Sequence, residues 1–154
     1  VEGLLCDVGA QRAAYAFVLR ADGLRRVMLF LYAVEPELRG KGVGSAFLEE
    51  LLGRYAACAG LYAEVEKAEL AEEEAERRVR QRRIAFYRRL GFAPIEGLYY
   101  SIYGVEMHLF YRPLQDPGIP GAQEAVRDAT ALYEGILLPH ERYNLDARPA
   151  GPKG

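Results

Sequence analysis

The stretch RGKGVGSAFLEELL, residues 39–52, places three glycines within five residues directly before an apolar pattern of helical spacing. Glycine-rich loops that open helices bind phosphate, because bare backbone N–H groups and the positive end of the helix dipole face the anion. Two familiar nucleotide loops are excluded. Lys41 precedes the last glycines, unlike the lysine of GxxxxGK, and Ser45 stands where GxGxxG needs its third glycine. The sequence therefore predicts an anion-binding loop of another kind.

Hydrophobic periodicity around the loop predicts a mixed α/β fold. Residues 27–34, VMLFLYAV, form a continuous apolar run, which is typical of a strand buried on both faces. The apolar spacing from Val43 onward predicts a helix face, and Gly60 is the expected stop of that helix. Further strands are predicted at residues 4–8, 13–19, 61–66, 92–95 and 102–111, and further helices at about 69–90 and 122–138. This order implies a mixed sheet with helices packed on it.

The size and composition of the chain suit one globular domain. The sequence has 154 residues, of which 51% are hydrophobic and 27% charged. We expect residues 1–112 to form the main part, with a linker and a C-terminal helix at 113–154 that pack on the same domain. No apolar run approaches the roughly 20 residues of a membrane span, so no membrane partner is expected.

Charge and metal-ligand spacing exclude further classes. A formal net charge of -2 gives no global attraction to nucleic acid, and the glutamates before the arginines of residues 77–83 neutralise that basic group. Cys6 and Cys58 lie far apart, and His108 and His140 have no partner at zinc-binding spacing. We therefore expect no metal, and buried thiols in a reducing cytoplasm.

The remaining loop pattern is R-x-x-G-x-G, spelled by Arg39, Gly42 and Gly44 after a strand that ends in VEPE. This pattern resembles motif A of the GNAT superfamily, the acyl-CoA-dependent N-acetyltransferases. Residues 84–92, IAFYRRLGF, resemble the second signature of that family, a helix that carries a tyrosine just before Gly-Phe. The resemblance implies a GNAT-like fold, here without the usual N-terminal strand and two helices and with an added C-terminal helix.

The resemblance also implies acetyl-CoA as cosubstrate, without a metal. The loop amides would bind the pyrophosphate, while the end of the preceding strand splays from its neighbour and pairs with the pantetheine arm like an added strand. Arg39 and Lys41 either add charge at the phosphates or only keep the surface soluble. The residues expected to bind the cosubstrate are Tyr32, Ala33, Val34, Arg39, Gly40, Lys41, Gly42, Val43, Gly44 and Ser45.

Two residues are candidates for the chemistry that the resemblance implies. Tyr87 matches the tyrosine that protonates the departing thiolate, although its spacing from Ile84 and Leu90 also suits a core position. Glu64 is the candidate base, with Glu66 on the same strand face as its rival. Either glutamate could act through water, or could simply end a strand in solvent.

The resemblance therefore predicts an N-acetyltransferase that acts on a primary amine of a small molecule or peptide. A non-catalytic CoA-binding or regulatory module on the same fold is the alternative, and a tRNA-directed acetylase is a third reading. The expected partners are acetyl-CoA and an amine acceptor, and a homodimer is left open. Tyr99, Tyr100 and Tyr103 either line an acceptor pocket or pack as ordinary strand residues.

Overall fold

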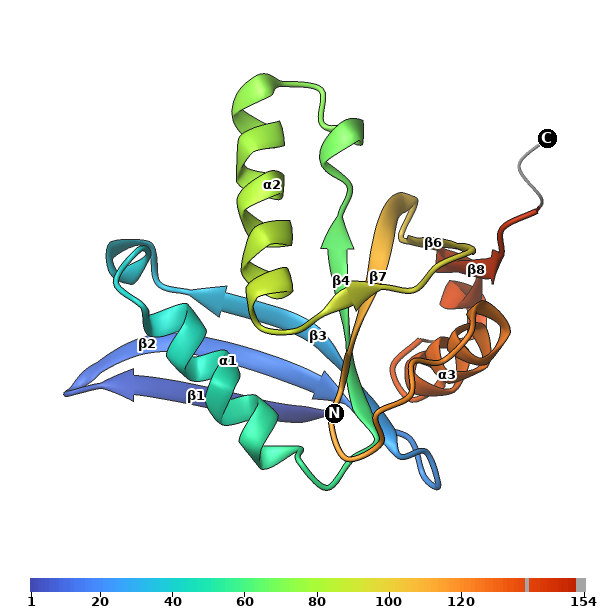
Figure 1. Cartoon of the computed structure of the whole chain (residues 1–154), viewed down its shortest axis with the longest axis horizontal. Helices are drawn as coiled ribbons and strands as arrows, with labels where there is room; N and C mark the ends of the chain where they lie inside the picture. The colour runs from blue at the N-terminus through green and yellow to red at the C-terminus, as the bar shows by residue number, and fades with distance from the viewer. Residues whose placement is uncertain (138, 152–154) are drawn as a thin grey trace.

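A mixed sheet with helices on both of its faces forms the protein (Figure 1), in a computed structural model that describes residues 1–137 and 139–151. The strand order is β1-β2-β3-β4-β7-β6-β8, and β5 pairs with β7 beside this path. β3 and β4 are parallel, and the other pairs are antiparallel. The strands are β1 (Glu2–Val8), β2 (Gln11–Leu19), β3 (Arg26–Val34), β4 (Gly60–Glu66), β5 (Ala93–Pro94), β6 (Leu98–Ile102), β7 (Val105–Pro113) and β8 (Leu145–Pro149).

Two helices cover one face of the sheet and a third covers the other. α1 packs on β2 and β3, α2 packs on β4, and α3 contacts β3 and β8. The α-helices are α1 (Val43–Arg54), α2 (Glu74–Arg89) and α3 (Ala122–Glu134), and the short 3-10 helices are η1 (Pro36–Leu38), η2 (Ala68–Leu70) and η3 (Pro139–Asn144). The predicted mixed α/β fold is therefore confirmed. Within the described residues, no helix combines the length and apolar character that crossing a membrane requires.

Two predicted helix boundaries were wrong because packing decides them. The helix expected over 69–90 begins at Glu74, after the turn η2, where Arg80 donates a hydrogen bond to the Lys67 carbonyl at 2.9 Å. The helix after the glycine loop ends at Arg54, well before Gly60. Gly60 instead opens β4, where a Cβ atom would lie 1.9 Å from the Tyr111 hydroxyl oxygen. That glycine is required by a close contact and not by a helix end.

The C-terminal third contains two strands that the sequence patterns did not predict. The expected connection between strands at 92–95 and 102–111 is itself β6, joined to β7 by Tyr103 and Gly104. Both turn residues have positive φ, 51° and 78°, as two-residue hairpin loops require. β8 pairs with β6, so the segment after the last helix joins the sheet. That helix ends at Glu134, and its expected end at residue 138 lies outside the described residues.

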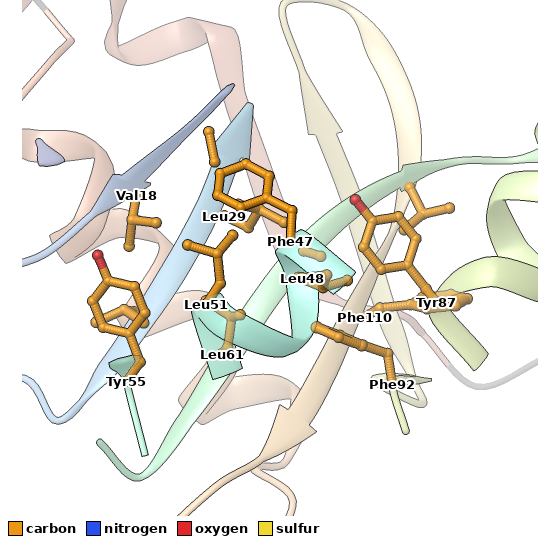
Figure 2. Packing of buried hydrophobic residues seen from close by; sticks show 14 of the residues in the cluster. Val18, Leu29, Phe47, Leu48, Leu51, Tyr55, Leu61, Tyr87, Phe92 and Phe110 are labelled. Atoms are coloured by element: carbon orange, nitrogen blue, oxygen red, sulfur yellow. The ribbon is translucent and has the colours of Figure 1, made fainter. Parts of the chain in front are cut away.

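A buried apolar cluster fills the space between the sheet and α1 and α2 (Figure 2). Side chains from one stripe of α1 meet alternate side chains of the strands, which is the packing that a 3.6-residue and a 2-residue period allow. Each such side chain contributes about 1.5–3 kcal/mol when fully buried. The residues labelled in Figure 2 are Val18, Leu29, Phe47, Leu48, Leu51, Tyr55, Leu61, Tyr87, Phe92 and Phe110.

A second buried cluster lies on the opposite face of the sheet, under α3. It differs from the first in its tyrosines, because Tyr62, Tyr100, Tyr111 and Tyr133 are all almost fully buried there. Buried hydroxyl groups require hydrogen-bond partners. We therefore expect polar groups on this face of the sheet that form hydrogen bonds with the tyrosine hydroxyl groups.

Candidate active site

Divergence of two parallel strands opens a cleft in the middle of the sheet. β3 and β4 pair only from Arg26 and Gly60 to Leu29 and Ala63, although both strands run further. In Figure 1 their arrowheads point apart, and α2 rises beside β4. A cleft of about 940 Å³ lies there, bounded by β3, the glycine loop, β4 and α2. The splay expected at the end of residues 27–34 is therefore present.

The end of β3 presents backbone groups to this cleft. The Glu35 N–H donates to the Ala13 carbonyl at 2.8 Å, toward β2. Because backbone groups of successive strand residues alternate sides, those of Val34 and Tyr32 point away from β2 and toward the cleft. The guanidinium Nε of Arg39 already donates to the Val34 carbonyl at 3.1 Å. A strand-like ligand could pair with the groups that remain.

The glycine loop presents unpaired amides at the start of α1. Gly40 and Gly42 have φ of 78° and 80°, in the left-handed region that favours glycine. The Ala46 N–H makes a hydrogen bond to the Gly42 carbonyl at 3.1 Å, closing the first helical turn. The amides of residues 43–45, which precede Ala46, have no carbonyl one turn earlier in the helix. This end of α1 therefore has the donor groups and the dipole that suit an anion.

Close packing around Gly44 holds the loop against β3 and α2. A Cβ atom on Gly44 would lie 3.4 Å from Cγ2 of Val34 and 3.8 Å from the Phe86 ring. The Tyr32 hydroxyl donates to the Gly44 carbonyl, and its ring stacks on Phe47 and Phe86 with centroids 5.5 Å and 6.2 Å apart. Burial raises the pKa of Tyr32, so this phenol keeps its proton. The Tyr32 side chain fixes the loop while its backbone faces the cleft.

Tyr87 belongs to both the core and the cleft. Its ring makes edge contacts with Phe86, Phe92 and Phe110 in the first cluster. In Figure 2 its hydroxyl oxygen is directed away from Phe92, and the side chain lines the cleft. Burial raises its pKa to about 12, against a lowering effect of Arg83. Tyr87 is thus a protonated phenol beside the cleft at neutral pH.

Glu64 lines the cleft from β4 and is held by two tyrosines. Its Oε2 accepts a hydrogen bond from Tyr100 of β6, and its Oε1 accepts one from Tyr133 of α3, both at 2.6 Å. Burial raises the pKa of Glu64, and the two hydrogen bonds oppose that rise. Tyr100, one of the three tyrosines left open between pocket and packing, therefore contacts the candidate base.

Glu66, which was expected on the same strand face as Glu64 and one step further along, has different partners. Glu66 forms ion pairs with Arg80 at 2.8 Å and Arg83 at 3.7 Å, both on α2. The tyrosines that bind Glu64 lie on the opposite face of the sheet. The physical reason is that β4 ends at Glu66, where the chain turns toward η2 and α2.

Most of the residues that were expected to bind the cosubstrate line the cleft. Eight of the ten residues expected to bind the cosubstrate line it, and Lys41 and Val43 do not. Arg82, Arg83 and Arg89 of α2 line it as well, although the sequence analysis considered arginines of this segment only as a possible nucleic-acid site. The sequence pattern that could have indicated their position is a stripe at helical spacing along α2, formed by Val79, Arg82, Arg83 and Phe86. Among the described residues, no group of three or more His, Cys, Asp or Glu is arranged to hold a metal ion.

The family model of the acetyltransferase (GNAT) domain matches residues 4–94 of this chain. The chain therefore belongs to the GNAT family of acetyltransferases. No curated protein matches the chain. Among solved structures, the ribosomal-protein-S18-alanine N-acetyltransferase from Escherichia coli is 26% identical, with 76% of this chain and 71% of that chain covered and a TM-score of 0.57.

Two further structures are similar in fold. A putative GNAT-family acetyltransferase from Bacteroides thetaiotaomicron is 22% identical, with 87% of this chain and 70% of that chain covered and a TM-score of 0.64. An acetyltransferase from Bacillus subtilis, solved in complex with CoA, is 14% identical, with 73% and 76% covered and a TM-score of 0.56. At these identities the likeness establishes the fold alone.

Proposed function

We propose that this protein is an N-acetyltransferase that moves an acetyl group from acetyl-CoA to a primary amine of a small molecule or peptide. One observation carries the proposal: the free amides of the glycine loop, the open edge of β3, Tyr87 and Glu64 all border one cleft. Membership of the GNAT family and the CoA complex of the Bacillus subtilis neighbour support the choice of cosubstrate.

The loop and the open strand bind the cosubstrate, which supplies an activated acetyl thioester. The amides at the start of α1, of which those of Gly44 and Ser45 belong to residues that line the cleft, donate to its pyrophosphate. The cleft-facing backbone groups of Tyr32 and Val34 pair with the amides of its pantetheine arm. Arg39 and the cleft arginines of α2 add positive charge. Lys41 does not line the cleft, which favours its interpretation as a surface residue.

Glu64 and Tyr87 divide the proton transfers. Glu64 takes a proton from the ammonium group of the acceptor, directly or through water, and leaves a neutral amine. The amine nitrogen bonds to the acetyl carbonyl carbon, and the carbon–sulfur bond breaks. Tyr87 donates its proton to the departing sulfur and regains one from the amide nitrogen. Glu64 returns its proton to solvent, so the products are an acetamide, the CoA thiol and one proton.

Glu66 is a less suitable base than Glu64. Its carboxylate is already bound by two guanidinium groups of α2, whereas Glu64 is bound by neutral hydroxyl groups.

Because α3 contacts β3 and β8 pairs with β6, we also propose that the segment after residue 112 belongs to the same domain as the cleft. We keep the cytoplasm as the proposed location.

The test is acetyl-CoA binding and turnover with the whole chain. Calorimetry measures CoA affinity, and thiol release measures turnover over a panel of small primary amines and a peptide that begins with alanine. We include that peptide because the Escherichia coli neighbour is named for an alanine acceptor. Amine-dependent thiol release with an acetylated product supports the proposal. CoA binding without turnover of any amine would favour the non-catalytic module, and absence of CoA binding would overturn both functions.

A further inference from the structure

The carboxyl group of Glu64 is fixed by two residues that lie beyond the segment matched by the family model. Tyr100 is on β6 and Tyr133 on α3, whereas the match ends at residue 94. Both tyrosine side chains are almost fully buried, with 1% of their surface exposed. We propose that Tyr100 and Tyr133 are positioning residues for the transfer reaction, which orient the Glu64 carboxylate in the cleft and keep it ionised. This inference rests on the proposed role of Glu64 as base.

The geometry suits a fixed proton acceptor. Each oxygen of Glu64 accepts one short hydrogen bond, so the carboxylate plane cannot rotate without breaking one of them. A carboxylate oxygen has two lone pairs, and one on each oxygen remains for the proton of an amine or of a bridging water. The two tyrosines therefore hold the carboxylate without using up its capacity as a base.

The tyrosine on α3 is itself held in register. Asp128, also on α3, accepts hydrogen bonds from Arg26 at 2.9 Å and from Tyr62, which lies two residues before Glu64 on β4. The ring of Tyr133 makes an edge contact with Phe30 of β3 at 6.1 Å between centroids. α3 is thus attached to the same two strands that diverge to form the cleft.

The surroundings of Glu64 leave the two hydroxyl groups as its main support. Its register partner on β7 is Leu109, and Phe30 of β3 lines the same cleft, so both neighbouring strands contribute apolar side chains. Glu66, the next acid on the strand, is paired with arginines of α2. On the other side Tyr62 donates to Asp128, which also pairs with Arg26. Burial raises the pKa of Tyr133, and the charge of Glu64 and, to a smaller extent, Tyr103 raise it further. Burial favours the neutral carboxyl group, and Tyr100 and Tyr133 oppose it.

The test is the pH dependence of kcat/KM for Tyr133→Phe and Tyr100→Phe. Each change removes one hydrogen bond to the carboxylate, so the acid limb should move to higher pH by about one unit, with the high-pH plateau nearly kept. Below the limb this is a loss of about tenfold. The matched control is Tyr62→Phe, which removes a buried tyrosine–carboxylate bond to the same helix α3 without touching Glu64. Its acid limb should stay in place.

A second measurement separates this inference from the proposed function. Carbon NMR of labelled glutamate follows the titration of the Glu64 carboxyl group directly, with CoA affinity as the check that each variant is folded. A higher Glu64 pKa in both tyrosine variants, together with the shifted acid limb, supports the inference. An unchanged Glu64 titration or acid limb in both variants overturns it, as does an equal shift in Tyr62→Phe. If Glu64 is not the base, the outcome is distinguishable, because the Glu64→Gln variant then keeps the acid limb of the wild-type kcat/KM profile.

Discussion

The two sides of the cleft are built by different means. On the α1 and α2 side, the glycine loop and the end of β3 offer backbone groups, and the space beneath them is filled by an apolar cluster. On the α3 side, buried tyrosines of the cluster donate to carboxylates: Tyr62 to Asp128, and Tyr100 and Tyr133 to Glu64. One side can bind an anion with little help from side chains, whereas the other depends on a few exact side-chain identities.

This difference implies that the residues for cosubstrate binding and the residues for catalysis can be altered separately. Backbone amides at a helix N-terminus bind phosphate whatever the side chains are, provided that the chain can approach closely. A buried carboxylate needs specific partners, since an unpaired buried charge is costly. We therefore expect substitutions in the loop to change affinity for CoA, and substitutions around Glu64 and Tyr87 to change turnover or its pH dependence.

The largest effect is expected for Tyr87→Phe. Removal of the hydroxyl group takes away the proposed proton donor to sulfur but leaves the ring packed in its cluster, so kcat should fall by about 10²–10⁴-fold. CoA affinity measured by calorimetry should hardly change. Full turnover in this variant would mean that Tyr87 serves only the core, and the cleft would then lack its acid.

A loss of about 10²-fold is expected for Glu64→Gln. Burial holds the pKa of Glu64 above its usual value, so the carboxylate form is present above that pKa and is lost as pH falls through it. In kcat/KM profiles the acid limb should therefore disappear in this variant, because glutamine accepts no proton at any pH. Glu66→Gln is the control and should act mainly on KM. Loss of the limb only in the Glu66 variant would move the base one step along the strand.

A smaller effect, a weakening of CoA binding by about 10- to 50-fold, is expected for Gly42→Asp. The left-handed φ of 80° strains most side chains, and a carboxylate at the helix N-terminus repels the phosphates. Gly42→Asn separates these causes, since asparagine tolerates the same backbone conformation without the charge. It should lose less affinity in calorimetry. Unchanged affinity in the folded Asp variant would remove the anion from this loop.

The smallest effect is expected for single loop cations. Arg39→Ala should weaken CoA binding by about fivefold, because Arg39 lines the cleft and also holds the Val34 carbonyl. Lys41→Ala should change it by less than about twofold, as is typical of an exposed charge. Calorimetry of both variants at two salt concentrations checks the order. A larger loss for Lys41 would mean that the phosphates lie outside the cleft that the described residues form.

Much of the glycine-loop side of the cleft could be predicted from local sequence. The strand before the loop, the loop itself and the start of α1 at Val43 follow from composition and periodicity within about twenty residues. The helix boundary at Glu74 and the role of Gly60 could not, because each depends on a contact with another element: Arg80 on the Lys67 carbonyl, and Tyr111 against Gly60. The hairpin at Tyr103 was missed because tyrosine is an unusual residue for positive φ.

The sequence by itself determined that Arg39, Gly42 and Gly44 stand before a helix and that Tyr87 stands before Gly-Phe, since such motifs depend on neighbours along the chain. Only the tertiary structure decided which groups surround Glu64. Its partners lie 36 and 69 residues away, on a strand and a helix that meet it through the packing of the sheet. Glu66 differs from it for the same reason, because the end of β4 turns toward the arginines of α2. Alternation along a strand specifies a face, whereas the charge and hydrogen bonding on that face depend on which distant elements cover it.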